Sequence, residues 1–281
     1  MPPPGARVRI AFLRRRIAAI EARDGPPPRG RGGLGEAGVP ASAQDFFEAL
    51  PGAFAQGGLS EIVPARPRDA AAAAGFASIL ALLAVAPRGA HAIWIAEDMA
   101  AQEIGLPYAK GLQALGLDPA RLIVARTRDA RDTLWTMEEA LKRGVGAVVA
   151  ESWITPGAYG LAASRRLSLA AQRGGGAGLL LLLRAAHQGA RLASAARLRF
   201  EVAAPSPPRA AKGCGPPLPG PLGWRLRLLK ARLGSGALDA PEWREIFFDP
   251  DWSAFRHAFP QRLPAETCDR PDLTAARRAL A

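Results

Sequence analysis

The chain has 281 residues, a formal net charge of +12 and a sequence pI of about 11.1. A chain of this length can bury a full core, which favours one large α/β domain with appendages over two equal domains. The positive charge indicates acidic partners, nucleic acid first among them. However, only four of the 37 basic residues are lysine. This compositional bias predicts that many of the arginines are simply solvated at the surface.

Three signals exclude other classes of protein. The most apolar run, Leu179 to Leu183, is far shorter than the roughly 20 residues of a membrane span. The first five residues lack the charged-then-apolar order of an export signal. Cys214 and Cys268 lie far apart, which supports neither a disulfide framework nor a zinc site. We therefore expect a cytoplasmic protein without metal or cofactor.

An amphipathic helix is predicted over residues 6–23, with an apolar stripe of Ile10, Leu13, Ile17 and Ile20. Such a helix is marginal in isolation, so the stripe should dock on the body of the chain or on a neighbouring protein. Use of its arginine-rich side along DNA is the least favoured reading. Residues 24–43, rich in Pro and Gly, are predicted to be a linker.

The body, residues 44–248, begins with a predicted strand over Ser60 to Val63. A nucleotide-binding P-loop would follow with G-x-x-x-x-G-K-[ST]. The chain instead has residues 64–70, PARPRDA, without the lysine and the hydroxyl and with two prolines that remove amide donors. Arg66 or Arg68 could still meet a phosphate near the start of the alanine-rich helix that runs to about Ala86, but tight Mg²⁺-nucleotide binding is not expected.

Acidic residues close two predicted buried strands. Glu97 and Asp98 follow Ala92 to Ala96, Glu151 follows Val145 to Ala150, and a predicted helix over residues 130–143 lies between the strands. The carboxyl ends of parallel strands are where α/β proteins bind ligands. The acids could hold a metal and an activated water, or only favour the N-terminus of the next helix.

The second half is predicted to contain a helix over residues 162–173, ended by Gly174 to Gly176, and a central strand over residues 179–183. Two alternating strands, residues 197–202 and 224–230, flank a Pro/Gly-rich loop at 205–221. If they pair in register they align a basic ladder of Arg197, Arg199, Arg225 and Arg227, which suits phosphates or is an ordinary solvated face.

A last core strand is predicted over Trp243 to Phe248, followed by a tail over residues 249–281. Trp252, Phe255 and Phe259 are spaced for a short helix, which could bind a groove of a partner or fold back on the sheet. Folding back is the favoured reading.

Several segments together resemble a RecA core, and their particular amino-acid sequences resemble the ImuA family of SOS-associated mutagenesis proteins. They are Trp94–Gln102, Gly116–Arg121, Ala130–Leu141 and Ala163–Ala171, and the resemblance covers about residues 44–248. It implies an α/β fold with a RecA-like, mostly parallel central sheet flanked by helices. To this core the residue patterns add the N-terminal amphipathic helix and a C-terminal antiparallel extension.

The resemblance also implies roles for individual residues. Glu151 falls where RecA proteins carry a metal-organising aspartate, and Glu97 or Asp98 where they carry the glutamate that activates water. Arg165 and Arg166 fall in the region that bears the DNA-facing loop and helix of RecA, or they form an ordinary solvated helix face. Because the phosphate loop is absent, the acids are interpreted as remnants of an ATPase site that now cap helices or bond neighbouring loops.

The favoured function is a non-catalytic accessory protein in damage-induced mutagenesis. The resemblance implies as partners an ImuB-type relative of Y-family polymerases and an error-prone DNA polymerase III alpha-type subunit, with contacts to RecA or single-stranded DNA. The alternatives are an active DNA-dependent ATPase of the RecA superfamily, opposed by the missing Lys-Thr pair, and an SOS cell-division inhibitor, for which the chain is long.

Overall fold

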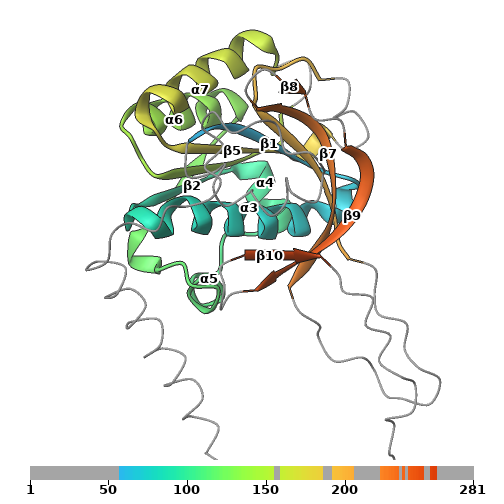
Figure 1. Ribbon diagram of the computed structural model, residues 1–281. Coiled ribbons are helices and arrows are strands. Elements are labelled where there is room, and N and C mark those ends of the chain that lie inside the picture. The colour runs from blue at the N-terminus through green and yellow to red at the C-terminus, as the bar shows by residue number, and fades with distance from the viewer. Residues whose placement is uncertain are drawn as a thin grey trace, which may run out of the picture.

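The computed structural model describes residues 57–154, 159–185, 192–205, 222–233, 236–237, 240–249 and 254–257. Their strands form one mixed sheet in the order β10-β9-β7-β6-β1-β5-β4-β2-β3, with β8 (Gly236–Ala237) paired to β7, and helices cover both faces of the sheet (Figure 1). This confirms the expected α/β class with its C-terminal antiparallel extension. The predicted helix over residues 6–23 and the linker lie outside the described residues.

The strands β1 to β6 are all parallel to their neighbours within this group. Each residue of β1, β4 and β5 is buried, as expected for strands covered on both faces. The edge strand β3 differs, since Ile123 and Val124 are exposed. The bounds are β1 (Gly58–Pro64), β2 (Ala92–Glu97), β3 (Leu122–Thr127), β4 (Ala147–Ser152), β5 (Ala177–Leu182) and β6 (Leu198–Ala203).

Helix α3 (Ala70–Val85) lies on one face of the sheet, and α6 (Ala130–Lys142) and α7 (Leu161–Gly174) lie on the other (Figure 1). The short helices α4 (Asp98–Ile104) and α5 (Ala109–Ala114) pack on the α3 side through Ala100 and Leu112. Single 3₁₀ turns span Pro67–Asp69 (η1), Ala86–Arg88 (η2), Pro119–Arg121 (η3) and Leu183–Ala185 (η4).

Helix α3 is apolar around most of its circumference. With the preceding turn, the segment Pro67–Val85 is long and apolar enough to cross a membrane by composition alone, but it is mostly buried. A helix that is hydrophobic on all sides is expected in the core of a large domain. The composition of α3 is therefore explained by packing between the sheet and the elements that cover the helix.

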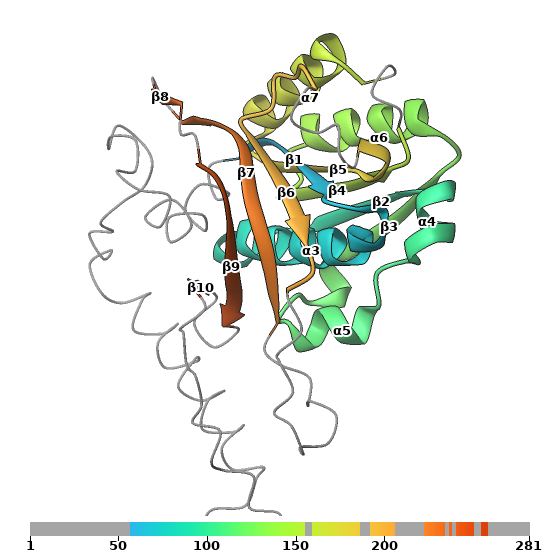
Figure 2. The ribbon, with the colours of Figure 1, turned by 90° about the vertical axis from the view of Figure 1, so that its right-hand side faces the viewer.

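The antiparallel extension consists of β7 (Gly223–Leu233), β9 (Ala240–Asp249) and β10 (Ala254–His257), and β7 and β9 run side by side past α3 (Figure 2). Trp224 of β7 packs 5.6 Å from the ring of Phe76 and donates its indole N–H to Ala72 O at 2.8 Å. These contacts attach the extension to α3, so it closes the core.

The alternating segments over 197–202, 224–230 and 243–248 are strands, as predicted. Phe255 was expected in a short helix and instead lies in β10, paired with Phe248. The helix prediction is wrong there, because β9 would otherwise leave its backbone groups unpaired at the sheet edge. Trp252 and Phe259 lie outside the described residues.

The run Gly174 to Gly176 ends α7, but only Gly175 needs a positive φ, at 69°. A Cβ on Gly174 would lie 1.9 Å from the carbonyl oxygen of Leu141, and one on Gly176 would lie 2.1 Å from that of Val145. The outer two glycines therefore allow the turn before β5 to pack directly on the turn before β4.

Candidate functional site

The segment after β1 occupies the position of a phosphate loop. The N–H of Ala65 donates to Val202 O at 2.8 Å, and that of Asp69 donates to Arg66 O at 2.9 Å. Pro64 and Pro67 have no N–H. A phosphate site needs several convergent backbone amides, and most of the amides from residue 64 to 69 are absent or already bonded.

Asp69 lies directly before α3 and is buried, and its carboxylate accepts a hydrogen bond from the N–H of Ala204 at 3.2 Å. A carboxylate is favourable at the N-terminus of a helix. The same charge repels a phosphate from the place where it would otherwise bind. Among the residues that the structure describes in this segment, Arg66 and Arg68 are exposed cations near this end of α3.

Two of the three candidate acids bond to neighbouring segments. Glu97 is buried, and its Oε2 accepts hydrogen bonds from Ser152 Oγ at 2.6 Å and from the N–H of Trp153 at 2.9 Å. Asp98 pairs with Arg126 at 2.7 Å on the surface. Both groups thus bond to the ends of neighbouring strands, and the Glu97 side chain makes no capping hydrogen bond to α4.

Glu151 lies on the other face of the sheet. It pairs in register with Ala96, so its side chain shares the α3 face with Ala96 while Glu97 is on the face of α6 and α7. The two glutamates therefore do not converge on one ion. Within the described part of the chain, no group of three or more His, Cys, Asp or Glu side chains is placed to hold a metal.

The environment of Glu151 is unusual for an acid. The side chain is 1% exposed, and burial raises its pKa to about 7, with a smaller opposing effect from the Trp94 indole. Glu151 Oε2 and Trp94 Nε1 are both buried, and neither has a partner within ordinary hydrogen-bond geometry. A buried carboxyl of this kind favours its neutral form.

Glu151 and Trp94 line a cavity of about 380 Å³, which we call the α3 pocket. Its walls come from α3 and from the segment that contains α4 and α5. No motif in the sequence predicts this pocket, because its members are spread over five elements and loops. The lining residues are Ala74, Gly75, Ser78, Trp94, Ile104, Gly105, Leu106, Pro107, Tyr108, Gly111, Leu112, Leu115, Glu151 and Leu222.

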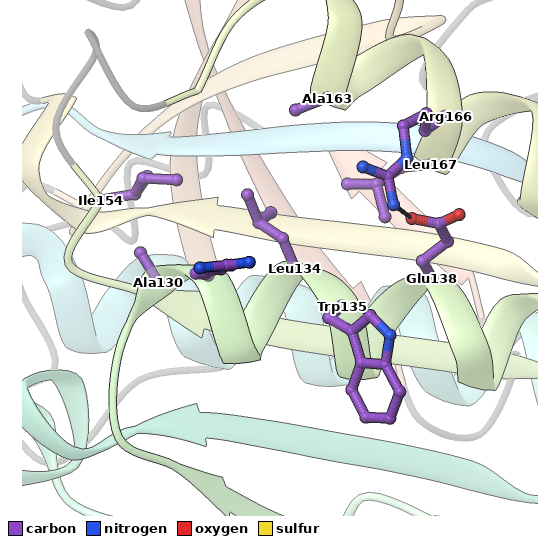
Figure 3. Close-up of a pocket in the computed structure, with 9 residues that line it drawn as sticks. Ala130, Leu134, Trp135, Glu138, Ile154, Ala163, Arg166 and Leu167 are labelled. Carbon is purple, nitrogen blue, oxygen red and sulfur yellow. Dashed lines mark hydrogen bonds and ion pairs between the residues drawn. The ribbon is translucent and has the colours of Figure 1, made fainter.

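A second cavity, of about 300 Å³, lies between α6 and α7 and contains Arg166, one of the predicted nucleic-acid residues (Figure 3). Arg166 points toward Glu138 and forms an ion pair with it. Burial alone would raise the pKa of Glu138, but hydrogen bonds from Lys142 and Arg166 hold it below its ordinary value. Arg165, the other predicted residue of α7, is exposed.

The predicted basic ladder is not a row of accessible cations. Arg199 is 2% exposed and donates through Nε to Glu61 Oε2 at 2.6 Å. The other oxygen of Glu61 accepts from Tyr159 Oη at 2.6 Å. Arg199 therefore cannot reach a phosphate, which corrects that assignment. Arg197 donates to Gly57 O at 2.8 Å, and burial lowers its pKa.

The remaining two arginines of the ladder face acids. Arg227 donates to Glu201 Oε2 at 2.6 Å across β6 and β7, and Arg225 lies 4.0 Å from Glu245 across β7 and β9. Both guanidinium groups also lie over the ring of Trp243, at 5.3 Å for Arg225 and 5.1 Å for Arg227. The pairing of the strands thus places an acid beside each of these two arginines. The pattern can be found in the sequence only when the acids of the facing strands are considered together with the arginines.

Comparison with known proteins gives one sequence relationship and one weak structural one. No protein-family model matches the chain. Two curated relatives, both called Protein ImuA, come from Caulobacter vibrioides strains NA1000 / CB15N and ATCC 19089 / CB 15. Each is 35% identical over 220 residues, which cover 71% of this chain and 83% of the relative.

Among solved structures, SulA from Pseudomonas aeruginosa matches at 23% identity and a TM-score of 0.34, covering 44% of this chain and 96% of that one. A TM-score this low does not establish a shared architecture. The sequence relationship is long and covers most of both proteins, and the order of strands and helices agrees with the fold expected from it. This chain therefore belongs to the ImuA family.

Proposed function

We propose that this protein is a non-catalytic, RecA-like accessory protein of damage-induced mutagenesis, which supports error-prone translesion DNA synthesis in the SOS response. Membership of the ImuA family supports the setting. The non-catalytic part of this proposal rests on the segment after β1. There, prolines, hydrogen-bonded backbone amides and the Asp69 carboxylate stand where a phosphate-binding loop would be. In this proposal the protein assembles other proteins in the cytoplasm and does not hydrolyse nucleotide.

The proposed partners are an ImuB-type Y-family polymerase relative and an error-prone DNA polymerase III alpha-type subunit, together with RecA and single-stranded DNA. Exposed apolar side chains support protein contacts, namely Ile123 and Val124 on the edge strand and Trp135 on α6. The net charge of +12 and the exposed Arg165 support contact with DNA.

The alternative of an active ATPase is less well supported. It would require Glu151 and either Glu97 or Asp98 to act together at a bound phosphate. Glu97 and Asp98 are held by Ser152, Trp153 and Arg126, and Glu151 faces the other side of the sheet from Glu97. The cell-division inhibitor alternative has only the match at a TM-score of 0.34, which carries no weight.

Thermal unfolding with and without Mg-ATP tests the non-catalytic assignment. A nucleotide at 100 times its dissociation constant would add about 2.7 kcal/mol to the stability of the native state, which corresponds to several degrees in Tm for a domain of this size. We expect no shift, while a RecA-superfamily protein with an intact phosphate loop shifts under the same conditions. A clear shift, or ATP turnover lost on Glu151→Gln, would refute the assignment.

Co-purification with the three candidate proteins tests the accessory role. We compare the full chain with one variant that lacks residues 1–23 and another that lacks the residues after Pro250. Loss of a partner from the first variant is expected if the N-terminal stripe makes a contact, through Ile10, Leu13, Ile17 and Ile20. Loss of a partner from the second variant is expected if the tail aromatics make one, through Trp252, Phe255 and Phe259. Retention of all partners by both variants would place the docking surface on the body, and failure of the full chain to retain any partner would reject the role.

A further inference from the structure

The α3 pocket combines apolar walls with a polar floor. Leu112, Leu115 and Ile104 line it from the α4–α5 side, and α3 contributes the small residues Ala74 and Gly75. Glu151 and Trp94 come from neighbouring strands of the sheet and are the most deeply buried of its polar groups. The pocket thus has the composition of a small-molecule site, with a mostly hydrophobic lining and few polar groups.

The charge of Glu151 has no counterion in this pocket. The described lining residues include no Lys, Arg or His, and their only other titratable side chain is Tyr108. Glu97, the nearest acid in the adjacent strand, bonds to Ser152 and Trp153 on the opposite face of the sheet. A buried carboxylate without a cationic partner is costly, so a cation that entered the pocket would be strongly favoured beside Glu151.

The aromatic and apolar lining indicates which class of cation the pocket would bind. Tyr108 lines the pocket and is largely exposed, so its ring is accessible to a ligand, and aromatic rings attract ammonium groups through the cation–π interaction. A carboxylate adds a charge-assisted hydrogen bond, and the leucines suit an apolar body. An anion such as a phosphate would instead meet the like charge of Glu151.

We propose that the α3 pocket binds a small organic ammonium ion, a primary amine on a compact apolar body, with its ammonium group against Glu151 and its body between α3 and α5. The ligand enters past Tyr108 and Leu106, which are 70% and 47% exposed. This site is independent of any nucleotide chemistry, since the segment after β1 takes no part in it.

Titration calorimetry of the full chain with 2-phenylethylammonium chloride tests the proposal, with the neutral 2-phenylethanol as its matched analogue. We expect the ammonium ion to bind about tenfold or more tightly than the alcohol, a difference of roughly 1.4 kcal/mol. Equal affinities for the two compounds, or no binding of the ammonium ion at millimolar concentration, would overturn the proposal.

Three variants locate the site. Glu151→Gln keeps the shape of the side chain and should weaken ammonium binding about tenfold or more. Tyr108→Ala changes an exposed residue, so folding should be unaffected while affinity falls severalfold. Glu97→Gln is the matched control on the opposite face and should bind like the wild type. A melting curve confirms that each variant is folded, and unchanged affinity in Glu151→Gln would reject the site.

Discussion

Replacing Glu151 by Gln should remove the pH dependence that this one side chain imposes on the stability of the folded protein. Burial raises its pKa from 4.5 to about 7 in the folded protein. Between these two values the native state binds more protons than the unfolded state, so stability is present at low pH and is lost as pH rises through 7. The difference between these two pKa values corresponds to about 3 kcal/mol of stability.

The measurement is urea unfolding of the wild type and Glu151→Gln at pH 5, 6, 7 and 8. Glutamine does not titrate, and the difference between the two proteins cancels the contributions of all other groups. We expect the variant to gain stability relative to the wild type by roughly 2.5 kcal/mol between pH 5 and pH 8, with most of the change complete by pH 7.

Glu138→Gln is the control with the opposite sign. Hydrogen bonds from Lys142 and Arg166 hold the pKa of Glu138 below its ordinary value. Ionised Glu138 therefore stabilises the folded protein at pH values above that ordinary pKa, and this contribution is lost only as the solution becomes more acidic. The Glu138→Gln difference should therefore stay constant from pH 5 to 8. A Glu151→Gln difference that is equally flat over this range would refute the assignment of an uncompensated buried carboxyl.

Three further predictions concern the core and the basic surface. Arg199→Ala should lower the free energy of unfolding in urea by about 3–5 kcal/mol, since it leaves the buried Glu61 carboxylate without its cationic partner; a loss under 1 kcal/mol would contradict the buried ion pair. Gly176→Ala should be destabilising by more than about 2 kcal/mol, whereas Gly160→Ala, with open space around the added Cβ, should melt close to the wild type; equal effects would disprove the close backbone approach. Arg165→Ala should weaken single-stranded DNA binding and reduce the magnitude of the slope of log K against log salt by about 1, as measured by fluorescence anisotropy. Arg173→Ala, at the end of the same helix, should have a smaller effect. Equal effects of the two substitutions would point to a diffuse charge effect.

Much of the architecture could be predicted from the sequence because many elements carry a local signal, but the strands β3 and β10 were not predicted. Continuous apolar runs such as Ala92 to Ala96 are typical of strands buried on both faces, and period-2 alternation predicted the strands around Phe200 and Trp224. Prolines and missing side-chain types are equally local, so the absence of a phosphate loop could be read from residues 64–70 directly. The amphipathic helix at residues 6–23 and the two tail aromatics beyond the described residues stay predictions.

What only the tertiary structure decided is the neighbourhood of each charge. Alternation places Arg199 and Arg227 on one face of the sheet, but it does not say that Glu61 and Glu201 lie across from them. The α3 pocket has the same origin, because the floor and the walls are far apart in the chain. Electrostatic energy depends on distance and burial, and those quantities are fixed only when strands distant in sequence become neighbours in the sheet.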